Sequence, residues 1–135
     1  MSWFLDKYEE GNDMEEFRFE EMRNAFMNEV QKIGKKNLEY AQKTGRPFHI
    51  GNLHITDGVR ALGYSEDSAE LDDIFSKYIK CDWGEGWSDA AINDKAIETG
   101  YGDVMGIYRL NGHVIWIKTD LNECTRTTIL LPEEW

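Results

Sequence analysis

The chain contains only two prolines, two cysteines and three histidines among its 135 residues. The cysteines, Cys81 and Cys124, lie far apart and form no CxxC pair, which favours two reduced thiols over a disulfide. No apolar run approaches the roughly 18 residues that a bilayer-spanning helix needs. The first residues also lack the basic and apolar regions of a signal peptide. We therefore expect a cytoplasmic protein that does not enter a membrane.

Motifs of common enzyme classes are also missing. The sequence contains no GxSxG, Walker A, GxGxxG or HExxH pattern. The histidines His49, His54 and His113 have no metal-ligand spacing among themselves or with the cysteines. We expect no metal and no cofactor, and the sequence assigns no catalytic residue.

The composition is that of a folded protein, with 41% hydrophobic and 13% aromatic residues. Abundant aromatic side chains supply the apolar burial that disordered chains lack. A chain of this length is the size of one domain. We divide it into a helical N-terminal segment, residues 1–46, and an α+β body, residues 47–135.

The formal net charge of −11 is unevenly distributed. Residues 1–31 carry −6 and residues 32–46 carry +4, whereas residues 47–94 carry −7 and residues 95–135 carry −2. Such a surface repels nucleic acid and anionic membranes and attracts basic partners. The alternative explanation is that the acidic residues serve solubility alone.

Hydrophobic periodicity predicts that the N-terminal segment is helical. The first ten residues can form a short amphipathic helix, and a long helix is expected from Met14 to Lys43, capped by Asp13. Gly34 is expected to bend or break this helix, and Gly45 to end it. Five apolar residues at helical spacing form one stripe along it: Phe19, Met22, Phe26, Val30 and Ile33.

The remainder of the chain predicts shorter helices followed by strands. Helical patterns cover about 57–62, 66–80 and 88–99, and strand patterns cover 104–110, 113–119 and 124–131. Asn111-Gly112 is a strong signal for a hairpin between the first two strands. Residues 48–55 can add a strand at one edge. The expected fold is α+β, with a helical N-terminal half packed on a small three- to four-stranded antiparallel sheet near the C-terminus.

The glycine-rich segment from Cys81 to Trp87 is expected to be a loop. It holds Trp83 and Trp87 between glycines, and two tryptophans on a loop are suited to anchor a protein partner. The alternative is that both side chains fold inward over the sheet. Asp82 and Asp89 flank the two tryptophans as the most notable pair of carboxylates.

Acidic residues recur at helical spacing in two places, Asp13–Glu16–Glu20 and Glu66–Glu70–Asp73. A four-residue helical step rises about 6 Å, which is of the same order as the roughly 3.4 Å between phosphates along one DNA strand. These rows are compatible with mimicry of nucleic acid. The predicted partner-binding residues are Glu16, Glu20, Glu66, Glu70, Asp73, Asp82, Trp83 and Trp87.

From about residue 49 onward, several segments resemble short accessory proteins encoded on bacterial plasmids and phages. They are the run from His54 to Leu62, Asp82-Trp83-Gly84 with Asn93, the hairpin with Tyr108 and residues 114–117, and the ending Arg126–Trp135. The acidic N-terminal helix and the residues around 64–73 depart from this pattern. The resemblance implies a mobile-element context, in which small acidic proteins often inhibit host defence, and it implies no catalytic residue.

Two functions from different classes follow as hypotheses. The preferred one is a non-enzymatic binding protein that inhibits a bacterial defence nuclease, such as a CRISPR effector or a restriction enzyme, by occupying its basic nucleic-acid-binding surface. The alternative is a small hydrolase with a pocket between helices and sheet. Its candidate residues would be Asp82, His54, Tyr108 and Arg126, and it requires that these side chains converge on one cleft.

Overall fold

The computed structural model describes residues 13–135, with side chains from Arg18 onward. Two compact units can be distinguished, one up to Lys32 and the other from Ile33 to Trp135. The short helix expected within the first ten residues, and the side chain of Glu16, lie outside the described residues. The elements in chain order are α2 (Asp13–Thr44), β1 (Asn52–Ile55), α3 (Asp57–Ala61), α4 (Ala69–Tyr78), η1 (Trp87–Asp89), α5 (Ala90–Thr99), β2 (Gly102–Leu110), β3 (His113–Leu121), β4 (Arg126–Leu130) and η2 (Pro132–Glu134).

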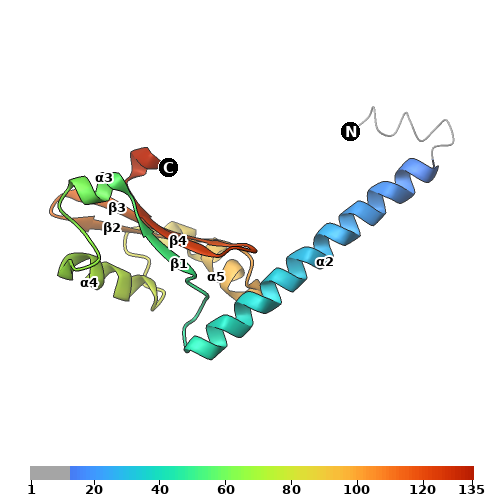
Figure 1. The fold of residues 1–135 in the computed structure, drawn as a ribbon, viewed down its shortest axis with the longest axis horizontal. Helices are drawn as coiled ribbons and strands as arrows, with labels where there is room; N and C mark the ends of the chain where they lie inside the picture. Colours follow the sequence, from blue (N-terminus) through green and yellow to red (C-terminus); the bar gives the residue numbers. More distant parts are fainter. Residues whose placement is uncertain (1–12) are drawn as a thin grey trace. The chain divides into compact units, whose positions relative to one another are not determined.

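The α+β prediction is confirmed, because helices dominate the N-terminal part and strands the C-terminal part (Figure 1). The sheet has the strand order β1-β4-β3-β2. β2 pairs antiparallel with β3, and β3 with β4, whereas β1 runs parallel to β4. The expectation of a purely antiparallel sheet was therefore wrong. A parallel pair needs a long crossover connection, and here three helices and two strands separate β1 from β4.

The β2–β3 hairpin forms where Asn111-Gly112 predicts it. Both turn residues have positive φ, 50° for Asn111 and 84° for Gly112. Two positive φ values define the type I′ turn, whose twist matches that of antiparallel strands. The register is fixed by this turn, so that Leu110 lies opposite His113 and Gly102 opposite Leu121.

Helix α2 continues through Gly34 without a break, in contrast to the sequence prediction. A Cβ atom at position 34 would clash with the carbonyl oxygen of Thr99, so this glycine permits a close approach between α2 and the C-terminal end of α5. Asn37 reinforces the contact by donating from Nδ2 to the carbonyl of Gly100 at 2.8 Å. The helix ends as predicted at Gly45, which has a φ of 70°.

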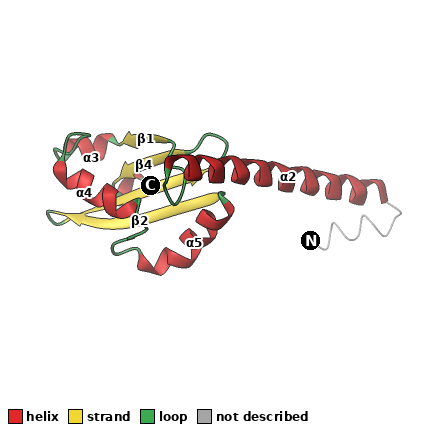
Figure 2. Ribbon diagram, turned by 90° about the horizontal axis from the view of Figure 1, so that it is seen from below, coloured by secondary structure: helices red, strands yellow, loops and turns green. Residues whose placement is uncertain are grey.

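Helix α4 packs on one face of the sheet and forms the core with it (Figure 1). The aromatic ring of Tyr78 packs against both Phe48 and Trp83, at centroid distances of 5.4 and 5.6 Å. The largest fully buried apolar side chains come from α3, α4 and the strands β2, β3 and β4: Val59, Tyr78, Val104, Ile115, Ile117, Leu121 and Ile129. Helix α5 lies along the β2 edge (Figure 2).

Three buried hydroxyl groups form a chain through this core. The Tyr78 hydroxyl lies 2.7 Å from Oγ1 of Thr119, which in turn lies 2.7 Å from Oγ1 of Thr127. Thr127 donates to the carbonyl of Ile50 at 2.7 Å, and the Tyr78 hydroxyl also reaches the carbonyl of Val104 at 3.0 Å. The chain connects α4 with two central strands and satisfies polar groups that would be costly to bury unpaired.

The C-terminal residues Glu134 and Trp135 connect α3 with the face of the sheet that lies away from α4. The carboxylate of Glu134 accepts hydrogen bonds from the Thr56 hydroxyl at 2.6 Å and from the Gly58 amide at 3.1 Å. Trp135 packs edge-on against Trp116 at 5.6 Å and lies 4.1 Å from the ammonium group of Lys118. These contacts give the terminal segment a structural role.

Candidate functional site

The two tryptophans of the glycine-rich loop have opposite orientations. Trp83 is buried at 7% exposure, whereas Trp87 is 76% exposed. The prediction that Trp83 is an exposed partner anchor is corrected, because its ring belongs to the core. Trp87 is available for a partner, and its binding role remains a prediction.

Backbone pairing explains why Trp83 turns inward. The Ile107 amide donates to the Trp83 carbonyl at 3.0 Å, and the Glu85 amide donates to the Ile107 carbonyl at 2.7 Å. The loop therefore adds a short bridge to the β2 edge, which fixes residue 83 beside the core. Asp82 supports the turn by accepting a hydrogen bond from the Gly84 amide at 3.1 Å. Asp82 thus has a structural role besides its predicted partner-binding role.

The predicted acidic residues whose side chains the structure describes are exposed, but two of them have cationic partners. Glu66 pairs with Arg60, and the hydrogen bond from Arg60 lowers the pKa of Glu66 to about 2. Asp73 pairs with Lys77 at 3.5 Å. Exposed pairs of this kind contribute little to stability, but each cancels a unit of charge.

Other carboxylates remain uncompensated. Within the described residues, no cationic side chain forms an ion pair with Glu70 or Asp72 in the first turn of α4. Glu20 is likewise exposed on α2. Negative potential is therefore retained beside α4 at residues 70 and 72.

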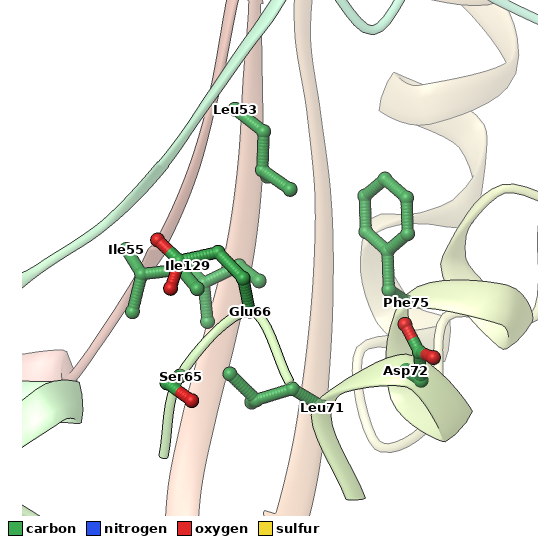
Figure 3. Close-up of a pocket in the computed structure, with 8 residues that line it drawn as sticks. All are labelled: Leu53, Ile55, Ser65, Glu66, Leu71, Asp72, Phe75 and Ile129. Atoms are coloured by element: carbon green, nitrogen blue, oxygen red, sulfur yellow. The ribbon is translucent and has the colours of Figure 1, made fainter. Parts of the chain in front are cut away.

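A small hollow lies between β1 and α4, which we call the β1–α4 notch (Figure 3). Its volume is about 40 Å³, room for one small group. Figure 3 shows apolar side chains from the sheet facing apolar side chains from α4, with carboxylates around them. The notch is lined by Leu53, Ile55, Ser65, Glu66, Leu71, Asp72, Phe75 and Ile129.

Strand β1 beside the notch is an open edge of the sheet. The amide of Asn52 donates to the carbonyl of Thr125, just before β4, at 3.2 Å, and the amide of Thr56 donates to the carbonyl of Ile129 on β4 at 3.1 Å. Because successive residues of a strand alternate in direction, Leu53 and Ile55 direct their backbone groups away from β4. The side chain of Leu53 is 46% exposed. An unpaired edge is a template for a further strand.

The opposite edge of the sheet is covered. The loop bridge at Gly84 occupies part of β2, and Asn93 of α5 occupies another part. Its side chain donates to the Met105 carbonyl at 2.8 Å and accepts from the Met105 amide at 3.0 Å, as a neighbouring strand would. The contrast between the two edges singles out β1 as the accessible one.

The four residues of the hydrolase hypothesis do not share a cleft. The Tyr108 hydroxyl donates to the backbone carbonyl of Asp82 at 2.7 Å, so these two residues are close. Tyr108 is four residues from Val104 and therefore lies on the same, buried face of β2. Arg126 is adjacent to buried Thr127 and lies on the other face, with His54 level with Thr128 beside it. These four side chains therefore do not converge on one cleft.

The face with Arg126 contains a charged row that the sequence analysis missed. Asp103, Asp120 and Arg126 lie level on β2, β3 and β4. Desolvation, followed by a hydrogen bond with Asp120, raises the pKa of Asp103, while Lys118 opposes the shift. Lys118 lies 3.1 Å from Asp120. Counting outward from the Asn111-Gly112 turn would have paired the two aspartates.

Other kinds of site find no support in the part of the chain that the structure describes. No group of three or more His, Cys, Asp or Glu side chains there is arranged to hold a metal ion. Among these same residues, no helix is both long and apolar enough to cross a membrane. Comparisons of the chain with family models, curated proteins and solved structures find no match.

Proposed function

We propose that this protein is a non-enzymatic binding protein that receives a basic, extended segment of another protein at the β1–α4 notch. The observation that carries the proposal is the open β1 edge beside an apolar hollow rimmed by carboxylates. A segment added to a sheet edge gains main-chain hydrogen bonds and places alternate side chains toward a pocket. The acidic rim would favour lysine or arginine in that segment.

The exposed Trp87 would give the complex a second, apolar contact. Its side chain is 76% exposed, and Ile92 on α5 is 65% exposed. Buried aromatic anchors contribute strongly to protein interfaces. Glu20, Glu70 and Asp72 would add long-range attraction to a basic surface.

We further propose that the partner is a nucleic-acid-binding protein, with a bacterial defence nuclease as the preferred class. The support is the net charge of −11 and the resemblance of the chain to mobile-element accessory proteins. Binding would then occupy a basic surface that otherwise holds nucleic acid. Such an interaction weakens as salt rises, because exposed charges are screened.

Affinity capture from bacterial lysate, followed by binding measurements with the purified retained protein, tests the proposal. We expect Glu70→Lys/Asp72→Lys and Leu53→Asp each to weaken binding at least about tenfold, equal to about 1.4 kcal/mol. The matched control Asp94→Lys/Glu98→Lys reverses two exposed charges on α5 and should have a smaller effect. Duplex DNA should compete with the protein for its partner.

Two results would contradict the proposal. One is a retained partner whose affinity is unchanged by the α4 and β1 variants. The other is a partner that binds DNA and this protein simultaneously. If both used the same basic surface, binding of one would prevent binding of the other. Circular dichroism of each variant confirms that loss of binding is not loss of fold.

A further inference from the structure

A hollow larger than the β1–α4 notch is formed by the C-terminal part of α2, the segment before β1 and the connection from β3 to β4. Its volume is about 420 Å³, within the range of small-molecule sites. All of its lining residues belong to the unit that begins at Ile33. We call it the His49 hollow, and the residues that determine its chemistry are Lys36, Asn37, Tyr40, His49, Glu123 and Thr125.

A buried polar network fixes the imidazole of His49 in this hollow. Asn37 and Thr125 are almost fully buried, at 3% and 6% exposure. Oδ1 of Asn37 accepts a hydrogen bond from the Thr125 hydroxyl at 2.9 Å and lies 2.9 Å from Nδ1 of His49. Because the amide nitrogen of Asn37 donates to the Gly100 carbonyl, Oδ1 can only accept, and Nδ1 of His49 carries the proton. Nε2 has no hydrogen-bond partner among the described residues and remains available to a ligand.

The charges that act on His49 are positive, although the protein as a whole is acidic. Burial, followed by Lys36 and Arg46, lowers the pKa of its imidazole. The carboxylate of Glu123 also lines the hollow and opposes this positive potential. A local positive potential attracts small anions, whereas the net charge of −11 repels long polyanions such as nucleic acid.

We infer that the His49 hollow binds a small anion that carries a phosphate group, either free phosphate or a nucleoside monophosphate. The phosphate lies beside the ammonium group of Lys36, which can form a charge-assisted hydrogen bond with it. Arg46 adds positive potential. Nε2 of His49 accepts a hydrogen bond from a P–OH group or, once the imidazole is protonated, donates to a phosphate oxygen.

Tyr40 distinguishes the two sources of the phosphate. Its ring stacks on that of His49, with a centroid distance of 4.5 Å and 12° between the planes, and 41% of the residue remains exposed. Tyr40 and Lys36 also line an adjoining hollow of about 270 Å³. A nucleoside monophosphate places its base beside Tyr40, and stacking of a base on an aromatic side chain strengthens binding. Free phosphate leaves Tyr40 uncovered.

NMR titration of the full chain with inorganic phosphate, and separately with adenosine monophosphate, tests the inference. At constant ionic strength, the Cε1–Hε1 signal of His49 should shift and saturate below about 5 mM ligand, a range that includes weak sites of millimolar Kd. The signal of His113, at the start of β3 and outside the hollow, should not shift.

The bound anion should also raise the pKa of His49. It stabilises the imidazolium, whereas Lys36 and Arg46 oppose protonation. The remaining titratable groups in the lining of the hollow are Tyr40, Glu123 and Cys124. The midpoint of the His49 signal against pH, measured with and without ligand, gives the shift.

Matched variants test the role of the charges. Lys36→Ala should weaken the binding of both ligands at least about fivefold, the effect of losing one charge-assisted contact. Glu123→Gln should strengthen binding, because it removes a like charge from the lining. Lys95→Ala removes the same charge as Lys36→Ala from an exposed position on α5, and should change the affinity by less than about twofold. Circular dichroism confirms that each variant is folded.

Saturation of the His49 signal by inorganic phosphate supports the phosphate site, and tighter binding of adenosine monophosphate identifies a nucleotide as the source. A His49 signal that shifts with neither ligand would overturn the inference, as would equal effects of Lys36→Ala and Lys95→Ala. Adenosine that binds as tightly as its monophosphate would also overturn it, because the ring and not the anion would then be recognised.

Discussion

Single hydroxyl groups in the core connect elements that are distant in sequence. Three hydroxyl protons are shared among four close contacts: Tyr78 donates to the Val104 carbonyl, Thr127 donates to the Ile50 carbonyl, and Thr119 donates to one of its two hydroxyl neighbours. Each group depends on its neighbour, because none of the three residues is exposed to water. Removing one member therefore leaves buried polar atoms without a partner.

Tyr78→Phe tests this chain directly. The substitution keeps the ring and removes the hydroxyl, so Thr119 loses a hydrogen-bond partner. We expect the free energy of unfolding, measured by urea denaturation, to fall by about 1–3 kcal/mol. Tyr40→Phe is the control, because Tyr40 is 41% exposed and its change should be within about 0.5 kcal/mol. Equal effects of the two substitutions would contradict the role of the buried chain.

At individual positions, the sequence predicted exposure only in part. It identified Trp83 and Trp87 as a pair, but their opposite orientations arise from the bridge between the loop and Ile107. Both tryptophans lie next to glycine in the same short segment, so the local sequence does not separate them. Only the three-dimensional register distinguishes the core residue from the surface residue.

At the level of elements, Gly34 shows how packing overrides local preference. Glycine is unfavourable inside a helix by about 1 kcal/mol relative to alanine. Here it allows α2 to approach Thr99 and Gly100 more closely than any other residue would. The sequence suggested a bend because nothing near Gly34 indicates the contact that requires a glycine there. The contacting residue, Thr99, lies 65 residues further along the chain.

Gly34→Ala therefore should destabilise the protein although it favours the isolated helix. Overpacking typically costs about 1–3 kcal/mol, and we expect a net loss in that range by urea denaturation. Gln31→Ala, on an exposed position of the same helix, should change the stability by less than about 0.5 kcal/mol. A stabilising effect of Gly34→Ala would show that α2 does not make this close contact.

Locally encoded elements were predicted well, and the pairing of distant ones was not. Asn111-Gly112 identified the hairpin, and Gly45 identified the end of α2. The parallel pairing of β1 with β4 has no local signal, because it depends on the path of the whole chain between them. The β1–α4 notch was missed for the same reason, although Glu66 beside it was identified.

At the level of the whole molecule, the charge of −11 opposes the compact state through self-repulsion. Five ion pairs are present among the described residues, fewer than the acidic groups. We expect the urea midpoint to rise when sodium chloride increases from about 10 to 150 mM, as the screening length shortens. A midpoint that falls over this range would show that these ion pairs outweigh the repulsion.

The β1–β4 pairing also constrains when the sheet can be completed. Asn52 pairs with Arg126, 74 positions later, and β1 has no other strand partner within the described residues. Contacts between such distant positions slow folding, because a large loop must close first. During translation, β1 leaves the ribosome long before its partner exists. The nascent chain must therefore hold this strand unpaired until β4 has been synthesised.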